Sequence, residues 1–185
     1  MINYFAIIHK YIAPTSPIYR YYVPHVTLVT CRALAVAKRL GLTKAQMIFI
    51  EEAAMLHDIG IVQVDAKEIG CQGDLPYICH GVEGRKILEA EKLPIHALVA
   101  ERHTGVGISK SEVIKNEYPL PKRDFIAVSL EEKIISWADL FYSKNPNKVW
   151  QERSIHKARK QIAKFGANKA RLFDEWHAQF EEDQL

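Results

Sequence analysis

The stretch Leu56-His57-Asp58-Ile59-Gly60 decides the interpretation of this chain, because a histidine and an aspartate stand side by side after an apolar segment. Neighbouring residues of a helix point about 100° apart. Both side chains can therefore contact the same point only if that point is an ion bound in a crevice. Further ligand-type side chains occur in or beside segments of helical apolar spacing: His25, His80, His103 and Asp139. Four imidazoles and two carboxylates can bind one divalent ion or two.

The order of these six residues resembles that of the HD-domain superfamily of metal-dependent phosphohydrolases, in its six-ligand form with an HDIG-type motif. The strings that carry the resemblance are Leu56-His57-Asp58-Ile59-Gly60, His80-Gly81-Val82-Glu83-Gly84, Arg102-His103-Thr104-Gly105, and Glu131-Glu132-Lys133-Ile134-Ile135 running on to Ala138-Asp139. The resemblance covers roughly residues 25–144. It implies that one ion is held by His25, His57, Asp58 and Asp139, and that Asp58 bridges to a second ion held by His80 and His103.

Composition bounds the class of protein. The 185 residues fit one domain with a real core, and 48% hydrophobic with 25% charged residues is typical of a soluble globular chain. No apolar run of about 18 residues and no secretory signal pattern occurs, so we expect a cytoplasmic protein with no membrane partner. The formal charge of +3 arises from 25 basic and 22 acidic residues scattered in mixed sign. This pattern does not favour nucleic acid as a partner.

Apolar periodicity is helical along the chain and no segment gives a strand pattern, so we expect an all-α, single-domain HD-type bundle of about seven or more helices. Residues 1–22 are aromatic and contain two prolines, and we expect an irregular segment packed on the helical domain formed by residues 23–185. The first long helix should begin near Pro24, with His25 in its first turn.

The next helix should open with a capping box at Thr43 and end at Gly60. Residues 61–79 show no clear period and are expected to form a loop, with a lid as one role for a loop of that length. His80 should begin a further helix, and another should run from Pro94 towards His103. A capping box at Ser129 should open the helix that carries Asp139, and one or two amphipathic helices should follow.

Several candidate ligands have an ordinary structural interpretation when each is taken alone. A histidine at the C-terminal end of a helix favours the helix dipole, whereas an aspartate there is opposed by it, which favours a cation beside Asp58. Asp139 borders a strongly apolar stripe that leaves it little polar surface. The cysteines Cys31, Cys71 and Cys79 form no CxxC pair and are expected to be free thiols outside the metal site.

The ligand types predict the chemistry. Imidazole and carboxylate together suit one or two divalent transition-metal ions, namely Mn, Fe, Co, Ni or Zn. A metal-bound hydroxide would then attack a small phosphorylated or nucleotide-like substrate at a phosphomonoester, phosphodiester or phosphoanhydride. Asp58, Arg102 and Lys133 are the candidate catalytic residues, with Lys144 as a further basic side chain near Asp139. The assembly is left open between a monomer and a homodimer.

Two other functions fit the same residues. The six ligands also resemble those of the diiron oxygenases of this superfamily, and a non-catalytic helical sensor could keep the metal for stability. Some HD phosphodiesterases carry lysine directly after the HDIG string, whereas this chain has Ile61 and lacks the GYP motif. Hydrolysis of cyclic dinucleotides is therefore not favoured by the sequence.

Overall fold

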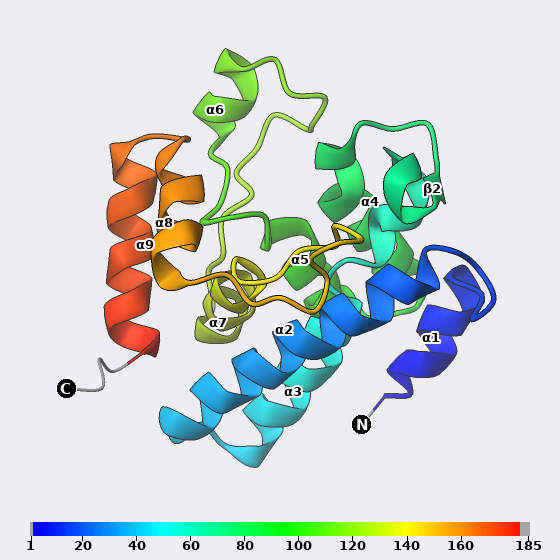
Figure 1. Cartoon of the computed structure of the whole chain (residues 1–185), viewed down its shortest axis with the longest axis horizontal. Coiled ribbons are helices and arrows are strands. Elements are labelled where there is room, and N and C mark those ends of the chain that lie inside the picture. Colours follow the sequence, from blue (N-terminus) through cyan, green and yellow to red (C-terminus); the bar gives the residue numbers. More distant parts are fainter. Residues whose placement is uncertain (1, 182–185) are drawn as a thin grey trace.

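A computed structural model describes residues 2–181; Met1 of the expected N-terminal segment and residues 182–185 of the expected domain lie outside it. Within this range the chain is helical, which confirms the all-α class (Figure 1). The helices are α1 (Tyr4–Tyr11), α2 (Tyr19–Arg39), α3 (Lys44–Leu56), α4 (His80–Ala90), α5 (Pro94–Arg102), α6 (Lys110–Lys115), α7 (Leu130–Asp139), α8 (Ile155–Ala163) and α9 (Ala167–Phe180). Among the described residues, no helix is long and apolar enough to cross a membrane.

Helices α2 and α3 lie side by side along one edge of the molecule (Figure 1). Gly41, with a φ of 68°, makes the turn between them, a left-handed conformation that glycine adopts without strain. The Thr43 side chain accepts from the backbone N–H of Gln46 and the Gln46 side chain returns to Thr43, so the expected capping box is confirmed. This hairpin brings the N-terminal half of α2 beside the C-terminal end of α3.

The expectation of an irregular segment up to residue 22 was wrong, because α1 forms and α2 begins at Tyr19. Pro24 consequently lies inside α2, where a proline removes a backbone donor at a cost of roughly 3 kcal/mol. Tertiary packing offsets this cost. Tyr22 is fully buried and its hydroxyl donates to the carbonyl of Met55 at 2.9 Å, which fixes the first turns of α2 against the end of α3.

The helix that carries the first motif ends at Leu56 rather than at the expected Gly60. Gly60 keeps an ordinary φ and serves a different purpose. A Cβ built there would lie 2.1 Å from the backbone nitrogen of Gly84 and 2.1 Å from the carbonyl oxygen of His80. Glycine is therefore required because α4 packs directly against the backbone after Asp58.

The segment expected to be a loop is a chain of short, packed elements. These are the 3₁₀ turns η1 (Ile59–Gln63), η2 (Lys67–Ile69) and η3 (Tyr77–Cys79), and the antiparallel strands β1 (Asp65–Ala66) and β2 (Cys71–Gln72). The strand pair corrects the expectation that no strand forms. Ile61, Val64 and Ile69 of this segment are buried, so much of it is anchored to the core.

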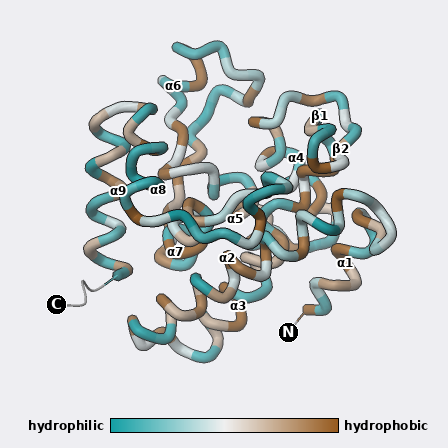
Figure 2. The backbone as a smooth tube through the Cα atoms, in the orientation of Figure 1, coloured by the Kyte–Doolittle hydropathy of each residue, from teal (hydrophilic) through white to brown (hydrophobic). Residues whose placement is uncertain are grey.

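Buried apolar residues form two main clusters. One joins α2, α3, α7, α8 and α9 around Trp137 and Phe173, and the other joins α1, the start of α2 and the segment after α3 around Tyr22 and Leu56. Figure 2 shows hydrophobic and hydrophilic positions alternating along the helices, as expected when each helix buries one face. Buried neighbours of His25 and His57 in the sequence, such as Tyr22, Val26 and Leu56, belong to the second cluster, so these two polar side chains are set within its apolar surroundings.

Candidate metal centre

The ends of the helices bring the six expected ligand side chains together. His57 and Asp58 follow α3, His80 is the first residue of α4, His103 follows α5, and Asp139 is the last residue of α7. His25 comes from the second turn of α2. The ligand atoms form two groups, each within 4.8 Å: His25, His57, Asp58 and Asp139 in the first, and Asp58, His80 and His103 in the second.

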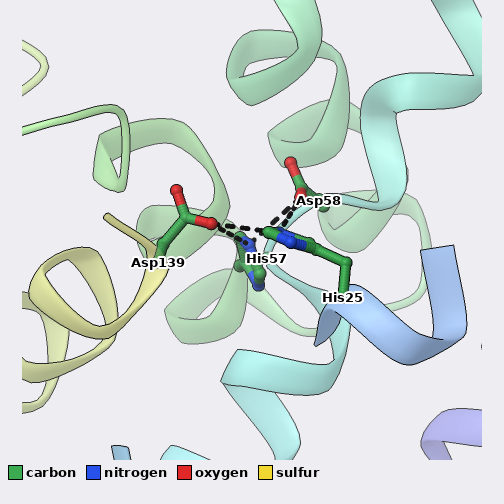
Figure 3. A group of neighbouring side chains, drawn as sticks. All are labelled: His25, His57, Asp58 and Asp139. Carbon is green, nitrogen blue, oxygen red and sulfur yellow. Dashed lines mark ion pairs between the residues drawn. The ribbon is translucent and has the colours of Figure 1, made fainter. Parts of the chain in front are cut away.

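The first group surrounds one point between α2, α3 and α7, as Figure 3 shows. His25 Nε2 lies 3.0 Å from Asp58 Oδ2 and 3.0 Å from Asp139 Oδ1. His57 Nε2 lies 3.2 Å from the same Asp58 oxygen and 3.6 Å from the same Asp139 oxygen. Two imidazole nitrogens and one oxygen from each carboxylate therefore face each other in a tetrad.

The second group uses the other oxygen of Asp58. His80 Nε2 and His103 Nε2 each lie 3.5 Å from Asp58 Oδ1. The same two nitrogens are 3.1 Å apart. Asp58, whose side chain is completely buried, thus presents Oδ2 to one group and Oδ1 to the other, which is the arrangement a bridging carboxylate needs.

The far nitrogen of three rings is held by the backbone. Nδ1 of His57, His80 and His103 lies 2.6, 2.7 and 2.8 Å from a carbonyl oxygen three residues earlier in each case. A carbonyl only accepts, so Nδ1 carries a proton in each ring, and Nε2 keeps its lone pair whenever the ring is neutral. Two such lone pairs face each other between His80 and His103, and a shared cation would relieve their repulsion. Metal-ligating histidines are commonly oriented by a partner on the far nitrogen in this way.

Orphaned polar atoms provide an independent test of whether these residues fit a metal. Among the described residues, the buried side-chain atoms that lack a hydrogen bond of good geometry include His57 Nε2, both carboxylate oxygens of Asp58 and Asp139 Oδ1, although Lys144 Nζ forms an ion pair with Asp58 Oδ2 at 2.6 Å. Buried polar atoms are normally satisfied, and leaving one unpaired costs about 1–3 kcal/mol. A divalent ion in each group would satisfy these atoms together, so the donor set fits the ions that the ligand types predict.

The electrostatics of the two groups differ. Burial opposes the charge on His57, but Asp58 and Asp139 outweigh it and raise its pKa to about 10. Burial and the neighbouring His103 lower the pKa of His80 to about 4. The pKa of Asp58 lies well below its ordinary value because Lys144 and His57 overcome the effect of burial. In the metal-free protein at neutral pH, His57 of the first group is therefore protonated, whereas His80 of the second group is neutral.

Lys144 enters the site more closely than either basic residue chosen from the sequence. Its Nζ lies 2.6 Å from Asp58 Oδ2 and 3.2 Å from His25 Nε2. Arg102 instead pairs with Glu132 at 3.3 Å, and Lys133 is partly exposed. The signal for Lys144 in the sequence was only its position five residues after Asp139, just beyond the end of α7.

A cleft of about 420 Å³ opens over the centre. His80, His103 and Asp139 form part of its floor, and Lys144 and Arg153 form part of its wall. Arg102 and Lys133 are not among the described residues that line it. The guanidinium of Arg153 is partly engaged, because it donates to the carbonyls of Leu140 and Tyr142 at 3.0 and 2.7 Å.

Other histidines and the cysteines lie outside the two groups. His96 Nε2 lies 3.2 Å from the Oε2 atom of Glu52. Cys71 and Cys79 are buried free thiols and Cys31 is an exposed one. None of these residues belongs to the ligand groups found among the described residues.

The family model of the HD domain matches residues 22–143. An uncharacterized protein of Methanocaldococcus jannaschii is 43% identical over 89 residues, which cover 46% of this chain and 43% of that protein. A tRNA (cytidine(56)-2'-O)-methyltransferase of Thermoplasma volcanium is 33% identical over 124 residues, covering 66% of this chain and 32% of the relative. The chain thus spans less than half the length of these curated relatives.

Two solved structures of the HD domain of the phosphodiesterase PgpH from L. monocytogenes share the fold. The first has a TM-score of 0.55 at 16% identity, and the match covers 100% of this chain and 91% of the PgpH chain. The second, in complex with cyclic-di-AMP, has a TM-score of 0.57 at 14% identity, and the match covers 100% of this chain and 90% of the PgpH chain. At such identities the likeness concerns the helical fold alone.

Proposed function

This chain belongs to the HD-domain family, and we propose that it is a metal-dependent phosphohydrolase acting on a small phosphorylated or nucleotide-like substrate. The observation that carries the proposal is the division of Asp58 between the two ligand groups, with Oδ2 facing His25 and His57 and Oδ1 facing the other histidines. A buried carboxylate shared in this way is suited to hold two cations beside one cleft.

The family also supplies the class of chemistry. Divalent ions at such a centre lower the pKa of coordinated water towards neutrality and withdraw charge from phosphoryl oxygens. The residues of this chain then have separate tasks. Asp58 would connect the two ligand groups, while His80 and His103, which line the cleft, would face the substrate side. The backbone carbonyls behind the three rings would keep each Nε2 free as a ligand.

We assign to Lys144 the role of binding the phosphate. The charges of Asp58 and Asp139 overcome burial and raise its pKa above the ordinary value, so its amino group stays protonated. An ammonium and a metal cation compete for the same Asp58 oxygen. Occupied ligand groups would therefore repel Lys144 from Asp58, and its four-carbon side chain can turn towards a phosphoryl oxygen in the cleft that it already lines.

A phosphatase screen tests the proposal. Purified protein loaded with Mn²⁺, Co²⁺, Fe²⁺ or Ni²⁺ should release phosphate or a nucleotide from at least one nucleotide, dinucleoside polyphosphate, cyclic nucleotide or aryl phosphate. Lys144→Met should raise KM for that substrate by about tenfold, whereas Lys160→Met, an exposed lysine on α8, should not. Inactivity of verified metal-loaded protein across the whole panel would reject the hydrolase.

The same experiment separates the other two functions. Iron in the purified protein together with substrate-dependent oxygen consumption would favour the diiron oxygenase. Tight metal binding without turnover would favour the sensor. Methyl transfer is not proposed, because the match covers only 32% of the methyltransferase relative.

A further inference from the structure

An apolar pocket lies against the cleft of the candidate metal centre. Its volume is about 140 Å³, and its apolar lining comes from Ile78, Val106, Ile108, Tyr118, Ile162 and Phe165. Four residues line both the pocket and the cleft: Thr104, Gly105, Ile162 and Phe165. The two hollows are therefore neighbours with a common wall, and a molecule bound at the metal centre could reach into both.

The loop after His103 shapes this wall. Gly105 and Gly107 have φ angles of 62° and 94°, left-handed conformations that favour glycine, so the chain turns sharply directly after a ligand residue. A Cβ built on Gly105 would lie in ordinary van der Waals contact with Ile162 Cδ1 of α8, at 3.7 Å. The close approach of this loop to α8 places the pocket beside His103.

One side of the pocket offers polar groups. Lys169 donates to the carbonyl oxygen of Gly107 at 2.6 Å and to Glu112 Oε2 at 2.8 Å, and both Lys169 and Glu112 line the pocket. Backbone atoms of the glycine loop lie on the same wall. The pocket thus combines apolar faces with a few polar groups, a combination typical of small-molecule sites.

We propose that this pocket binds the nucleobase of the substrate whose phosphate is held at the metal centre, so that the substrate class is a nucleotide rather than a sugar phosphate. This inference rests on the proposed phosphohydrolase function. Apolar cavities of about 150 Å³ can hold a benzene-sized ring, so the volume here suits one aromatic ring. Phe165, with 64% of its surface exposed, has a ring free to stack on a base.

Binding of nucleosides tests the pocket independently of catalysis. Uridine and adenosine carry no phosphate, and we expect calorimetry on the metal-loaded protein to show saturable millimolar or tighter binding of at least one, but none of ribose. Ile108→Trp should fill the pocket and weaken nucleoside binding at least tenfold. Phe165→Ala should weaken it about threefold to tenfold, whereas Phe5→Ala, a partly exposed aromatic on α1, should have no effect.

Kinetics separate failure of this inference from failure of the proposed function. Wild type should hydrolyse uridine or adenosine 5′-monophosphate with a kcat/KM at least tenfold above that for ribose 5-phosphate; Ile108→Trp should lower this ratio towards one, whereas Phe5→Ala should leave it unchanged. Equal use of both substrates, with no nucleoside binding, would overturn the nucleobase pocket and leave the hydrolase intact. Inactivity on all of them with nucleoside binding retained would reject the hydrolase and keep the pocket.

Discussion

The two ligand groups share Asp58 but are assembled differently. The first draws His25, His57 and Asp139 from α2, α3 and α7, contains two carboxylates, and is contacted by Lys144. The second adds only His80 and His103, whose supporting helices α4 and α5 pack against each other, and these two side chains face the cleft. The pKa of His57 is raised to about 10, whereas that of His80 is lowered to about 4. Imidazoles a few ångströms apart thus differ because one has two carboxylates beside it and the other has mainly a second imidazole.

This contrast suggests that the two groups contribute differently to folding and to turnover. The first group ties distant parts of the chain together and should contribute to folding when it holds an ion, because ions bind the assembled site rather than the unfolded chain. The second group places both of its histidines in the lining of the cleft, whereas Asp139 is the residue of the first group that lines it, so the second group should matter more for turnover. The following changes test these separate contributions of the two groups, starting with the largest expected effect.

Asp58→Ala should affect both groups at once, because each of its oxygens faces a different one. We expect metal content to fall from about two ions per chain to near zero and activity to fall at least about a hundredfold. Metal analysis and the phosphatase assay measure these effects. Asp65→Ala, at an exposed acidic residue, is the control. Retention of one full ion by Asp58→Ala would show that the two groups are independent.

His103→Ala should remove only the second group. Metal content should fall towards about one ion per chain, and activity should fall by about ten- to a hundredfold, while the thermal stability stays closer to wild type than in His25→Ala. Metal analysis and melting curves on both variants make the comparison. Unchanged occupancy in His103→Ala would leave a mononuclear centre in which His103 contacts the substrate instead.

Removal of metal should lower Tm by about 10 °C. An ion present at a thousandfold above its Kd stabilises the folded state by about 4 kcal/mol, and each kcal/mol shifts Tm by about 2–4 °C for a chain of this size. Calorimetry with and without chelator measures the change. His25→Ala should show a much smaller response to chelator than His103→Ala. Identical melting curves before and after verified metal removal would contradict a link between the first group and folding.

Gly60→Ala should disturb the second group through the backbone. The new methyl would lie 2.1 Å from the carbonyl oxygen of His80, so α4 must move away from Asp58. We expect a loss of about 2–3 kcal/mol of stability, measured by chemical denaturation, together with weaker binding of the second ion. Ala163→Gly, at the end of α8, is the control for an exchange of alanine and glycine in an ordinary helical position. Gly166→Ala would not serve, because the φ of Gly166 is 122°. Normal metal content in Gly60→Ala would show that this contact does not position His80.

The smallest effect concerns pH. In the metal-free protein, His57 has a folded pKa of about 10 against an ordinary value of 6.5, so its contribution to stability is complete below pH 6.5 and is lost as the pH rises towards 10. We expect Tm of the metal-free protein to fall by a few degrees across this range. Metal must displace the His57 proton, so metal affinity should instead rise with pH. His57→Gln should abolish the fall in Tm and make the rise in metal affinity with pH less steep. A Tm of the metal-free wild type that does not change with pH would contradict the charge assigned to His57.

Local signals in the sequence predicted much of the fold. The capping box of α3 and the start of α5 at Pro94 follow from rules that involve only neighbouring residues. The Ser129 side chain likewise accepts from the backbone of Glu132 at the start of α7. The errors occurred where distant packing outweighed these rules. Tyr22 stabilises a helix through Pro24, and α4 requires a glycine at position 60 for close approach rather than for helix termination.

Residue identity and apolar periodicity, which are local properties of the chain, were enough to predict the chemical types of the candidate ligands, their order and the all-α class. The packed arrangement of the helices was needed to show that the two oxygens of Asp58 face different histidines and that Lys144 enters the site while Arg102 pairs with Glu132. It was also needed to show that an apolar pocket adjoins the cleft. These features depend on the relative positions of helices, which arise from contacts between residues far apart in the chain. Helical periodicity specifies which face of a helix is buried, but not which side chain from another helix will meet it.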